Sequence, residues 1–348
     1  MARIVSVGAA LQDVYLIDHD DFGINKRGYF NQIELGSKID IDKIYFSTGG
    51  GATNAATTFA RNNHESIFMG CIADDTAGHA IIEALDQEGI DNSYITYTDK
   101  VNTGYSVILL TPSGERTILT CRGASAKFDL LDPNDLDTIY PDWLYVTTMR
   151  GNMDMLDQFF TKAKELDAKI MFNPGNLELQ HPRKMIGLLS DVDVLLVNKD
   201  EAKKLVPGTT LKELVNRLKN YVPNVIITDG NQGAIATDGN EVYRIGLYED
   251  VPVKDATGAG DSFGSGFLAA FANGRSFTDS IIFASANSTS VVQYVGSKKG
   301  IISSNTRLHD AWATTSNYSM AVLGEFIAEF FGFFAPFAFF GKAGGAKN

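Results

Sequence analysis

Short apolar runs alternate with segments of helical periodicity along most of this 348-residue chain. Between the runs, stretches such as MDMLDQFFTKAKEL place apolar residues at helical spacing. Strands that are apolar on both sides and separated by amphipathic helices indicate a mainly parallel sheet covered on both faces. We therefore predict a three-layer α/β/α fold in which ligands bind beyond the carboxyl ends of the strands. The expected buried strands are Arg3–Gly8, Trp143–Thr148, Lys169–Asn173, Val192–Asn198 and Asn224–Asp229.

Two regions interrupt this alternation and predict a small second sheet. Residues from about 13 to 47 and from 105 to 121 have the pattern of β-strands, and the second region surrounds a Pro-Ser-Gly turn. Strands inserted at the edge of an α/β core are typical of a small lid. We expect one domain over residues 1–310 that carries this lid, followed by a tail over residues 311–348.

The charge balance and the cysteine count exclude some classes of protein. Lys and Arg total 30 against 42 Asp and Glu, so the formal charge of −12 argues against a general nucleic-acid binder, whose surface should be basic. Cys71 and Cys121 are the only cysteines, which supports neither a disulfide framework nor a Cys-rich zinc site. The first residues, MARIVSVGAA, fit a strand and lack the apolar core of a signal peptide. A cytoplasmic location is the simplest expectation.

The stretch KDATGAGDSFGSGF, Lys254–Phe267, has the composition of an anion site at the start of a helix. Gly258 and Gly260 let the backbone approach an anion closely, and a helix N-terminus offers unpaired N–H groups. Asp261 would then lie in the first helical turn, where a carboxylate can accept a proton from a substrate hydroxyl. Composition alone equally allows a glycine-rich turn with an acidic first helical turn, because short glycine motifs are weak evidence.

Three motifs together resemble the ribokinase-like (PfkB-type) sugar kinase family: DATGAGDSF, STGGGATNAA and NKDEA. The resemblance covers about Arg3 to Leu308, and its most specific motif departs from the family pattern only at Ala256. It implies a ribokinase-like fold and transfer of the γ-phosphoryl group of ATP, with Mg²⁺, to a hydroxymethyl group of a sugar or nucleoside. A non-catalytic sugar or nucleotide sensor on the same fold is the alternative, against which the intact Asp261 counts.

The resemblance assigns catalytic roles to the glycine-rich stretch. Asp261 matches the catalytic base, and the N–H groups of Gly258, Ala259 and Gly260 match the anion hole that holds the phosphoryl group in transit. The same region matches ligand positions for a monovalent cation, so the resemblance allows a potassium ion. The residues at those positions are Asp255 and Thr257, with Gly296 near a third.

Two further motifs match the nucleotide side of the family's site. Asn198 and Glu201 match the N-x-x-E motif, which positions magnesium and phosphate largely through water. Thr228, Gly230 and Gly233 match the family's nucleotide-binding loop. Taken alone, the first motif also fits an ordinary helix cap and the second an ordinary β-turn.

The acceptor side matches the family less completely. Asp13, Gly49, Gly50 and Asn54 match positions that bind substrate hydroxyls. Leu11 stands where the family commonly has Asn, and the segment VTTMRGN has no counterpart of a glutamate that ribokinases use for ribose. These departures leave ribose-type sugars, nucleosides and keto-sugar acids open as acceptors.

Two arginines and the lid strands leave further alternatives open. Arg116 and Arg122 can hold a phosphate or carboxylate of the substrate, or they can be solvated charges at a strand edge. Lid strands of this family often pair between subunits, so a homodimer through the lid is a further expectation.

The end of the chain does not match the family. Eight phenylalanines fall between residues 326 and 340 in an apolar run of membrane-spanning length. Glu325 and Glu329 oppose insertion into a bilayer, and Pro336 would end a helix. We expect a helix over about residues 319–334 that packs on protein or contacts a membrane surface and takes no part in catalysis.

Overall fold

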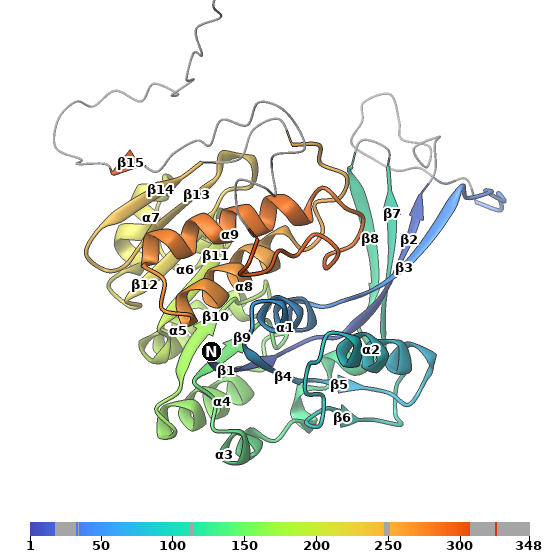
Figure 1. Cartoon of the computed structure of the whole chain (residues 1–348), viewed down its shortest axis with the longest axis horizontal. Coiled ribbons are helices and arrows are strands. Elements are labelled where there is room, and N and C mark those ends of the chain that lie inside the picture. Colours follow the sequence, from blue (N-terminus) through green and yellow to red (C-terminus); the bar gives the residue numbers. More distant parts are fainter. Residues whose placement is uncertain (18–32, 34, 112–113, 247–250, 307–323, 326–348) are drawn as a thin grey trace, which may run out of the picture.

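The computed structural model describes residues 1–17, 33, 35–111, 114–246, 251–306 and 324–325. Within them the chain forms a large sheet between two layers of helices, and a smaller sheet projects from this body (Figure 1). This arrangement confirms the predicted three-layer fold with a mainly parallel sheet and a small lid.

The large sheet contains all five strands that the apolar runs predict. Its strands are β1 Arg3–Val7, β4 Glu65–Met69, β9 Trp143–Val146, β10 Lys169–Phe172, β11 Val194–Asn198, β12 Asn224–Thr228, β13 Ala234–Thr237, β14 Val242–Ile245 and β15 Gly324–Glu325. Their order is β15-β14-β13-β12-β11-β10-β9-β1-β4. The strands from β12 to β4 in this order are parallel, whereas β13, β14 and β15 add an antiparallel edge.

Successive side chains of the parallel strands pack against opposite helical layers. On β1, Ile4 lies in a core with Phe59 and Phe267, whereas Val5 lies in a second core with Phe160. This alternation explains why both faces of the strands are mainly apolar. One layer consists of α1 Gly51–Arg61, α8 Ala259–Ala272 and α9 Phe277–Val291. The other consists of α3 Leu136–Ile139, α4 Met153–Glu165, α5 Pro182–Leu188, α6 Lys199–Leu205 and α7 Leu211–Leu218, while α2 Thr76–Gln87 packs beside α1.

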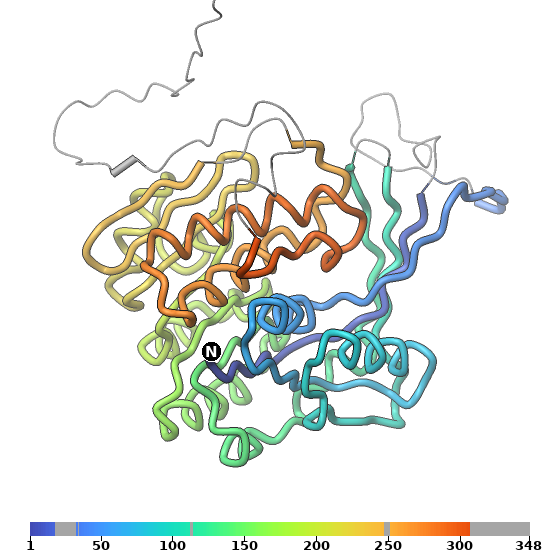
Figure 2. Tube along the Cα trace, in the orientation of Figure 1, coloured from blue at the N-terminus to red at the C-terminus, as the bar shows by residue number. Residues whose placement is uncertain are grey.

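Helices α1 and α8 lie side by side although they come from opposite ends of the chain (Figure 2). Both sequences, GATNAATTFAR and AGDSFGSGFLAAFA, are rich in small residues, which permit close approach. Between the helices, Ser265 Oγ lies 2.8 Å from Thr58 Oγ1, and within α8 it lies 2.7 Å from the Asp261 carbonyl oxygen. The close packing brings the N-terminal ends of both helices to one place.

The lid is a four-stranded sheet in the order β3-β2-β7-β8. Its strands are β2 Leu11–Ile17, β3 Lys43–Gly49, β7 Gly104–Leu110 and β8 Arg116–Cys121, and a separate pair consists of β5 Cys71–Ile72 and β6 Thr96–Tyr97. Asp13 pairs with Ser47 and Ser106 in neighbouring strands, and Asp13 and Ser106 are buried. One lid face therefore covers the body, whereas Phe46 and Leu119 on the other face are exposed.

The tail falls almost entirely outside the described residues. Gly324 and Glu325 pair with β14 as a two-residue antiparallel strand. The expected helix over 319–334 is therefore wrong at these two residues, because their backbone is extended and bonds to a sheet edge. The rest of that helix, and its contact with a membrane, stays a prediction. No helix among the described residues is long and apolar enough to cross a bilayer.

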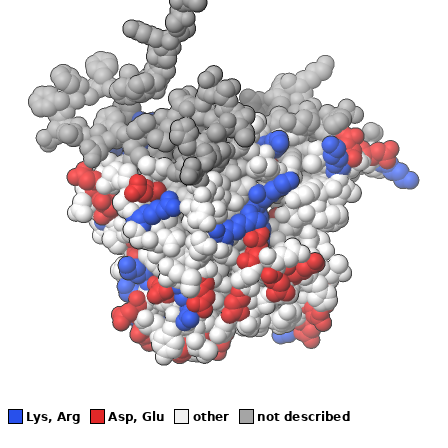
Figure 3. All heavy atoms as spheres, viewed as in Figure 1, with Lys and Arg blue, Asp and Glu red and all other residues white. Residues whose placement is uncertain are grey.

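Positive and negative side chains are interspersed on the face that Figure 3 shows, without a continuous basic surface among the residues described there.

Candidate active site

Asp261 lies in the first turn of α8, and the N-terminal ends of α8 and α1 meet at its carboxylate. The Asn54 amide Nδ2 donates to Asp261 Oδ2 at 2.9 Å, and a Cβ added to Gly51 would lie 3.2 Å from Oδ1. Burial raises the pKa of Asp261, whereas the Asn54 hydrogen bond and the charge of Lys298 lower it. The site thus holds a carboxylate in a fixed orientation with an increased affinity for a proton.

Asn54 is itself held from its other end. Its Oδ1 accepts a hydrogen bond from the buried Ser297 hydroxyl at 2.8 Å, which fixes which end of the amide faces Asp261. The resemblance predicts that Asn54 contacts the substrate. In the structure its side chain instead orients Asp261, and a contact with a sugar hydroxyl stays a prediction.

The backbone around Asp261 leaves several N–H groups open. Gly258 caps α8 in the left-handed region with φ 78°, and no side chain caps this helix end. Within the described chain, the N–H groups of Gly258 and Gly260 have no backbone acceptor, while Ala259 N–H makes only a 3.4 Å bond. A Cβ added to Gly260 would meet nothing within 4 Å, so this part of the helix start borders open space. This cradle suits a phosphoryl group.

Asp13 and the two glycines that precede α1 form the neighbouring side of the site. A Cβ on Gly49 would lie 1.9 Å from Asp13 Oδ2, and a Cβ on Gly50, whose φ is 102°, would lie 2.2 Å from the Ala9 carbonyl oxygen. Gly49 therefore lets the Asp13 carboxylate lie against β3, and Gly50 lets the start of α1 approach the chain between β1 and β2. Burial raises the pKa of Asp13 to about 6, although the Ser106 hydroxyl and the Lys298 charge lower it.

Lys298 is a site residue that the sequence did not reveal. Its Nζ donates to Thr48 Oγ1 at 2.7 Å and to Thr53 Oγ1 at 3.0 Å. Burial lowers the pKa of Lys298 to about 8, and the charges of Asp13 and Asp261 oppose that change. The only signal was its place two residues after Gly296 in GSKKG, which does not distinguish it from a surface lysine.

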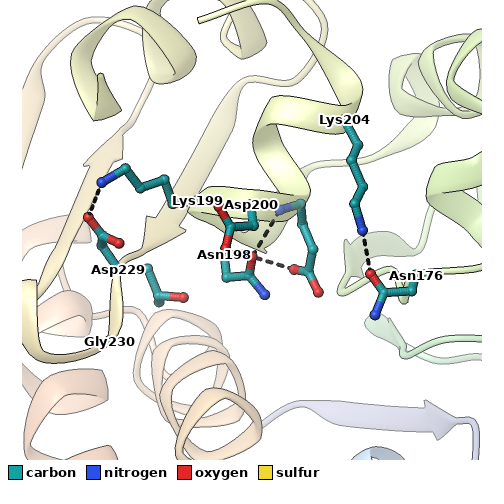
Figure 4. Close-up of a pocket in the computed structure, with 9 residues that line it drawn as sticks. Asn176, Asn198, Lys199, Asp200, Lys204, Asp229 and Gly230 are labelled. Carbon is teal, nitrogen blue, oxygen red and sulfur yellow. Dashed lines mark hydrogen bonds and ion pairs between the residues drawn. The ribbon is translucent and has the colours of Figure 1, made fainter. Parts of the chain in front are cut away.

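The predicted nucleotide residues line a cavity of about 400 Å³ beyond the ends of β11 and β12 (Figure 4). Gly230 lies there with open space around its Cα, whereas a Cβ on Gly233 would lie 2.1 Å from the Ile245 carbonyl oxygen. Gly230 thus belongs to the cavity wall, and Gly233 lets β14 approach closely. The cavity is lined by Asn176, Asn198, Lys199, Asp200, Glu201, Lys204, Thr228, Asp229 and Gly230.

Asn198 and Glu201 form a capping box at the start of α6. The Glu201 N–H donates to Asn198 Oδ1 at 2.9 Å, and the Asn198 N–H donates to Glu201 Oε2 at 2.8 Å. Both residues therefore have a local structural role as well as a place in the cavity wall. No group of three or more His, Cys, Asp or Glu residues in the described chain could hold a metal ion. The residues here fit a magnesium ion that is held mainly by phosphate and water.

Asp255 lies fully buried in the loop before α8 and already has several donors. Its Oδ1 accepts from Thr257 N–H at 2.9 Å and Thr257 Oγ1 at 2.6 Å, and its Oδ2 accepts from Gly296 N–H at 3.1 Å. Arg116 Nε reaches across from the lid to within 3.9 Å of Oδ1. This guanidinium supplies positive charge beside the Asp255 carboxylate, and the potassium ion that the resemblance allows at Asp255 and Thr257 stays a prediction.

A family model described as pfkB family carbohydrate kinase matches residues 1–303. The chain belongs to the PfkB family of carbohydrate kinases. A ribokinase from Arabidopsis thaliana is 25% identical over 305 residues, which cover 84% of this chain and 76% of the relative.

Two solved structures share the PfkB fold of this chain. The nucleoside kinase of Methanocaldococcus jannaschii has a TM-score of 0.74 at 20% identity, covering 90% of this chain and 99% of that chain. A protein described as a ribokinase II of E. coli, in complex with ATP and Mg²⁺, has a TM-score of 0.73 at 20% identity, covering 90% and 98%. These likenesses show the fold of this chain, and the family match shows that it belongs to the carbohydrate kinases.

The raised pKa of Asp13 predicts a pH-dependent cost to stability. The folded-state pKa of about 6 exceeds the ordinary value near 4, so ionisation of Asp13 opposes folding. The cost is absent below about pH 4 and complete above about pH 6, where it amounts to about 3 kcal/mol. We expect the Asp13→Asn variant to match the unaltered protein at pH 4 and to have a higher free energy of unfolding at pH 8.

Urea unfolding between pH 4 and 8 measures this difference. Asp157→Asn, at an exposed position on α4, is the matched control and should leave the pH dependence unchanged. Parallel pH curves for the Asp13→Asn variant and the unaltered protein would contradict a raised pKa at Asp13.

Proposed function

We propose that this PfkB kinase transfers the γ-phosphoryl group of ATP to a hydroxymethyl group of a sugar or nucleoside, with Asp261 as general base. The observation that carries this proposal is the Asn54–Asp261 hydrogen bond beside the open N–H groups of α8. One carboxylate oxygen is fixed by Asn54, which leaves the other to accept the proton of the attacking hydroxyl. Membership of a kinase family gives no support to a non-catalytic sensor.

The start of α8 would stabilise the phosphoryl group during transfer. The N–H groups of Gly258, Ala259 and Gly260 would hold the transferred group beside the open space at Gly260. Fixed donors are effective here because they need no reorganisation as charge develops on the transferred group. Lys298 adds positive charge close to Asp261.

ATP would extend from α8 to the cavity beyond β11 and β12. Thr228 and Gly230 would contact the nucleotide, and Gly233 would shape the loop that presents them. Asn198 and Glu201 would orient water around the phosphates. When bound, Mg²⁺ neutralises phosphate charge during transfer.

The acceptor would lie between the lid and the start of α1. Asp13 would accept hydrogen bonds from sugar hydroxyls, and Gly49 and Gly50 would let the sugar approach the backbone. The lid would then exclude water, which otherwise competes as an acceptor. We also propose that residues 1–310 form the kinase domain, that the lid is where a homodimer would form, and that the tail is dispensable for transfer.

The role of Asp261 is tested by Asp261→Asn. The amide keeps the shape of the side chain but cannot take the proton, so we expect turnover to fall by ~10²–10⁴ while ATP binding persists. Coupled ADP release over a panel of sugars and nucleosides measures turnover, and Asp157→Asn serves as control. Near-normal turnover of the Asp261→Asn variant would refute the role of this carboxylate.

The anion cradle is tested by Gly260→Ala. The added methyl meets no protein atom, and alanine is the better helix former, so the variant should fold at least as stably as the unaltered protein. It should lose turnover by ~10²–10³ because the methyl would enter the space proposed for the phosphoryl group beside the N–H donors. Gly187→Ala in α5 is the matched control, since a Cβ there also meets nothing. Full activity of the Gly260→Ala variant would show that the phosphoryl group does not bind at these N–H groups.

Potassium dependence was allowed by the resemblance, but the Arg116–Asp255 contact favours its absence. We expect the same turnover in potassium and in tetramethylammonium chloride at equal ionic strength. In the Arg116→Ala variant the charge of Asp255 is no longer compensated, so added potassium should raise turnover. Strong activation of the unaltered enzyme by potassium would show that Arg116 does not replace the ion.

A further inference from the structure

Two arginines bring unpaired guanidinium groups to the acceptor side of the site. Arg122 follows lid strand β8, and Arg150 follows strand β9 of the large sheet. In the part of the chain that the structure describes, neither guanidinium has a hydrogen-bond or ion-pair partner, and both residues are exposed. Exposed arginines are common on protein surfaces, so exposure alone does not indicate a ligand site, and the positions of these two residues decide whether they form one.

The lid register places Arg122 close to Asp13. Cys121 pairs with Tyr105 and Thr120 with Ser106, so residue 122 lies opposite Gly104. A Cβ on Gly104 would lie 2.5 Å from the Arg122 carbonyl oxygen, which confirms this proximity. Because side chains alternate along a strand, position 122 shares a lid face with Ser106 and Asp13, the face that covers the body.

Arg150 is held in an unfavourable backbone conformation. Its φ is 56°, in the left-handed region, which costs a residue other than glycine ~1 kcal/mol or more. The fully buried Glu178 carboxylate fixes the turn by accepting from the Thr148 hydroxyl and from Gly151 N–H, each at 2.9 Å. The Arg150 N–H in turn donates to Thr148 Oγ1 at 3.1 Å. The buried Glu178 carboxylate thus fixes the turn on which the exposed Arg150 lies.

The turn that carries Arg150 lies at the point where the strand order of the large sheet reverses. From β1 the chain continues to β4 on one side, whereas β9 leads to β10, β11 and β12 on the other. In open α/β sheets ligands bind at such a point, beyond the carboxyl ends of the strands. The nucleotide cavity lies farther along, at β11 and β12, so Arg150 belongs to the acceptor side.

The charged side chains around Arg122 and Arg150 indicate which kind of ligand would bind there. Burial and the charge of Arg150 lower the pKa of Arg122, and the charge of Asp13 opposes them, so the three groups are near one another. Asp13 and Asp261 give the acceptor site two carboxylates, and Lys298 donates to two threonines. Lys298, Arg122 and Arg150 carry three positive charges against the two negative charges of Asp13 and Asp261, so the excess positive charge favours a further anion bound at the two guanidinium groups.

We propose that Arg122 and Arg150 bind a phosphate or carboxylate group carried by the acceptor sugar, so that the preferred acceptor is anionic. This inference rests on the proposed function, since it specifies the acceptor of that same site. The guanidinium fork suits both anions, because each presents two oxygens to parallel N–H donors. The hydroxymethyl group that receives the phosphoryl group then lies at the other end of the sugar, towards Asp261.

The test uses matched neutral and anionic acceptors: fructose with fructose 6-phosphate, and glucose with gluconate. Coupled ADP release gives kcat and KM for the unaltered enzyme and for Arg122→Gln, Arg150→Gln and the double variant. Arg217→Gln is the control, because this exposed arginine lies on α7, in the helical layer opposite α1 and α8. We expect one anionic acceptor to have the lower KM, and each glutamine substitution to raise that KM about tenfold or more.

The neutral acceptors should respond little to these substitutions, and Arg→Lys variants should recover part of the loss. Preference for the sugar phosphate or for the sugar acid identifies the bound anion. If neutral acceptors are used as well as anionic ones and the glutamine variants are unchanged, the inference is wrong and the proposed function stands.

Calorimetric binding to the Asp261→Asn variant separates the two claims. If no acceptor supports ADP release, the proposed function fails on this panel. Tighter binding of an anionic acceptor, lost in the Arg122→Gln and Arg150→Gln backgrounds, would still support the anion site. Equal or weaker binding of both anionic acceptors relative to their neutral partners would refute it.

Discussion

The hydrogen bond from Asn54 to Asp261 links the two halves of the site across 207 residues of sequence. It exists because α1 and α8 carry small residues that let the helices pack closely. The same packing aligns both helix N-termini on one carboxylate, where their partial positive charge opposes the desolvation of Asp261. This one contact fixes the orientation of the Asp261 carboxylate beside the open N–H groups at the start of α8.

The lid is joined to the body by polar and charged groups at both ends of its inner face. At one end, Lys298 donates to Thr48 of lid strand β3 and to Thr53 of α1. At the other end, Arg116 reaches Asp255 in the loop that precedes α8. Through these contacts the position of the lid affects both the acceptor side and the phosphoryl side. The site is therefore assembled from two sheets, and neither sheet alone contains it.

The fold followed from the sequence more completely than the site did. Apolar runs flanked by helical periodicity predicted the parallel strands, because burial on both faces favours mainly apolar residues. Glycine and aspartate at the start of α8 marked the candidate base. Lys298 and Arg150 were not found, since their importance depends on which distant segments surround them. Asn54 was found, but its bond to Asp261 and its bond from Ser297 are tertiary contacts that local sequence does not encode.

The central claim is that Asn54 sets the protonation of Asp261, the proposed general base. Its most direct test is the pH dependence of kcat/KM for the Asn54→Ala variant. The hydrogen bond from Asn54 lowers the pKa of Asp261, so its loss should raise that pKa and move the acidic limb of the profile to higher pH. A profile that keeps its acidic limb at the same pH while activity falls would contradict the claim, because the titrating group would then not be the carboxylate that Asn54 holds.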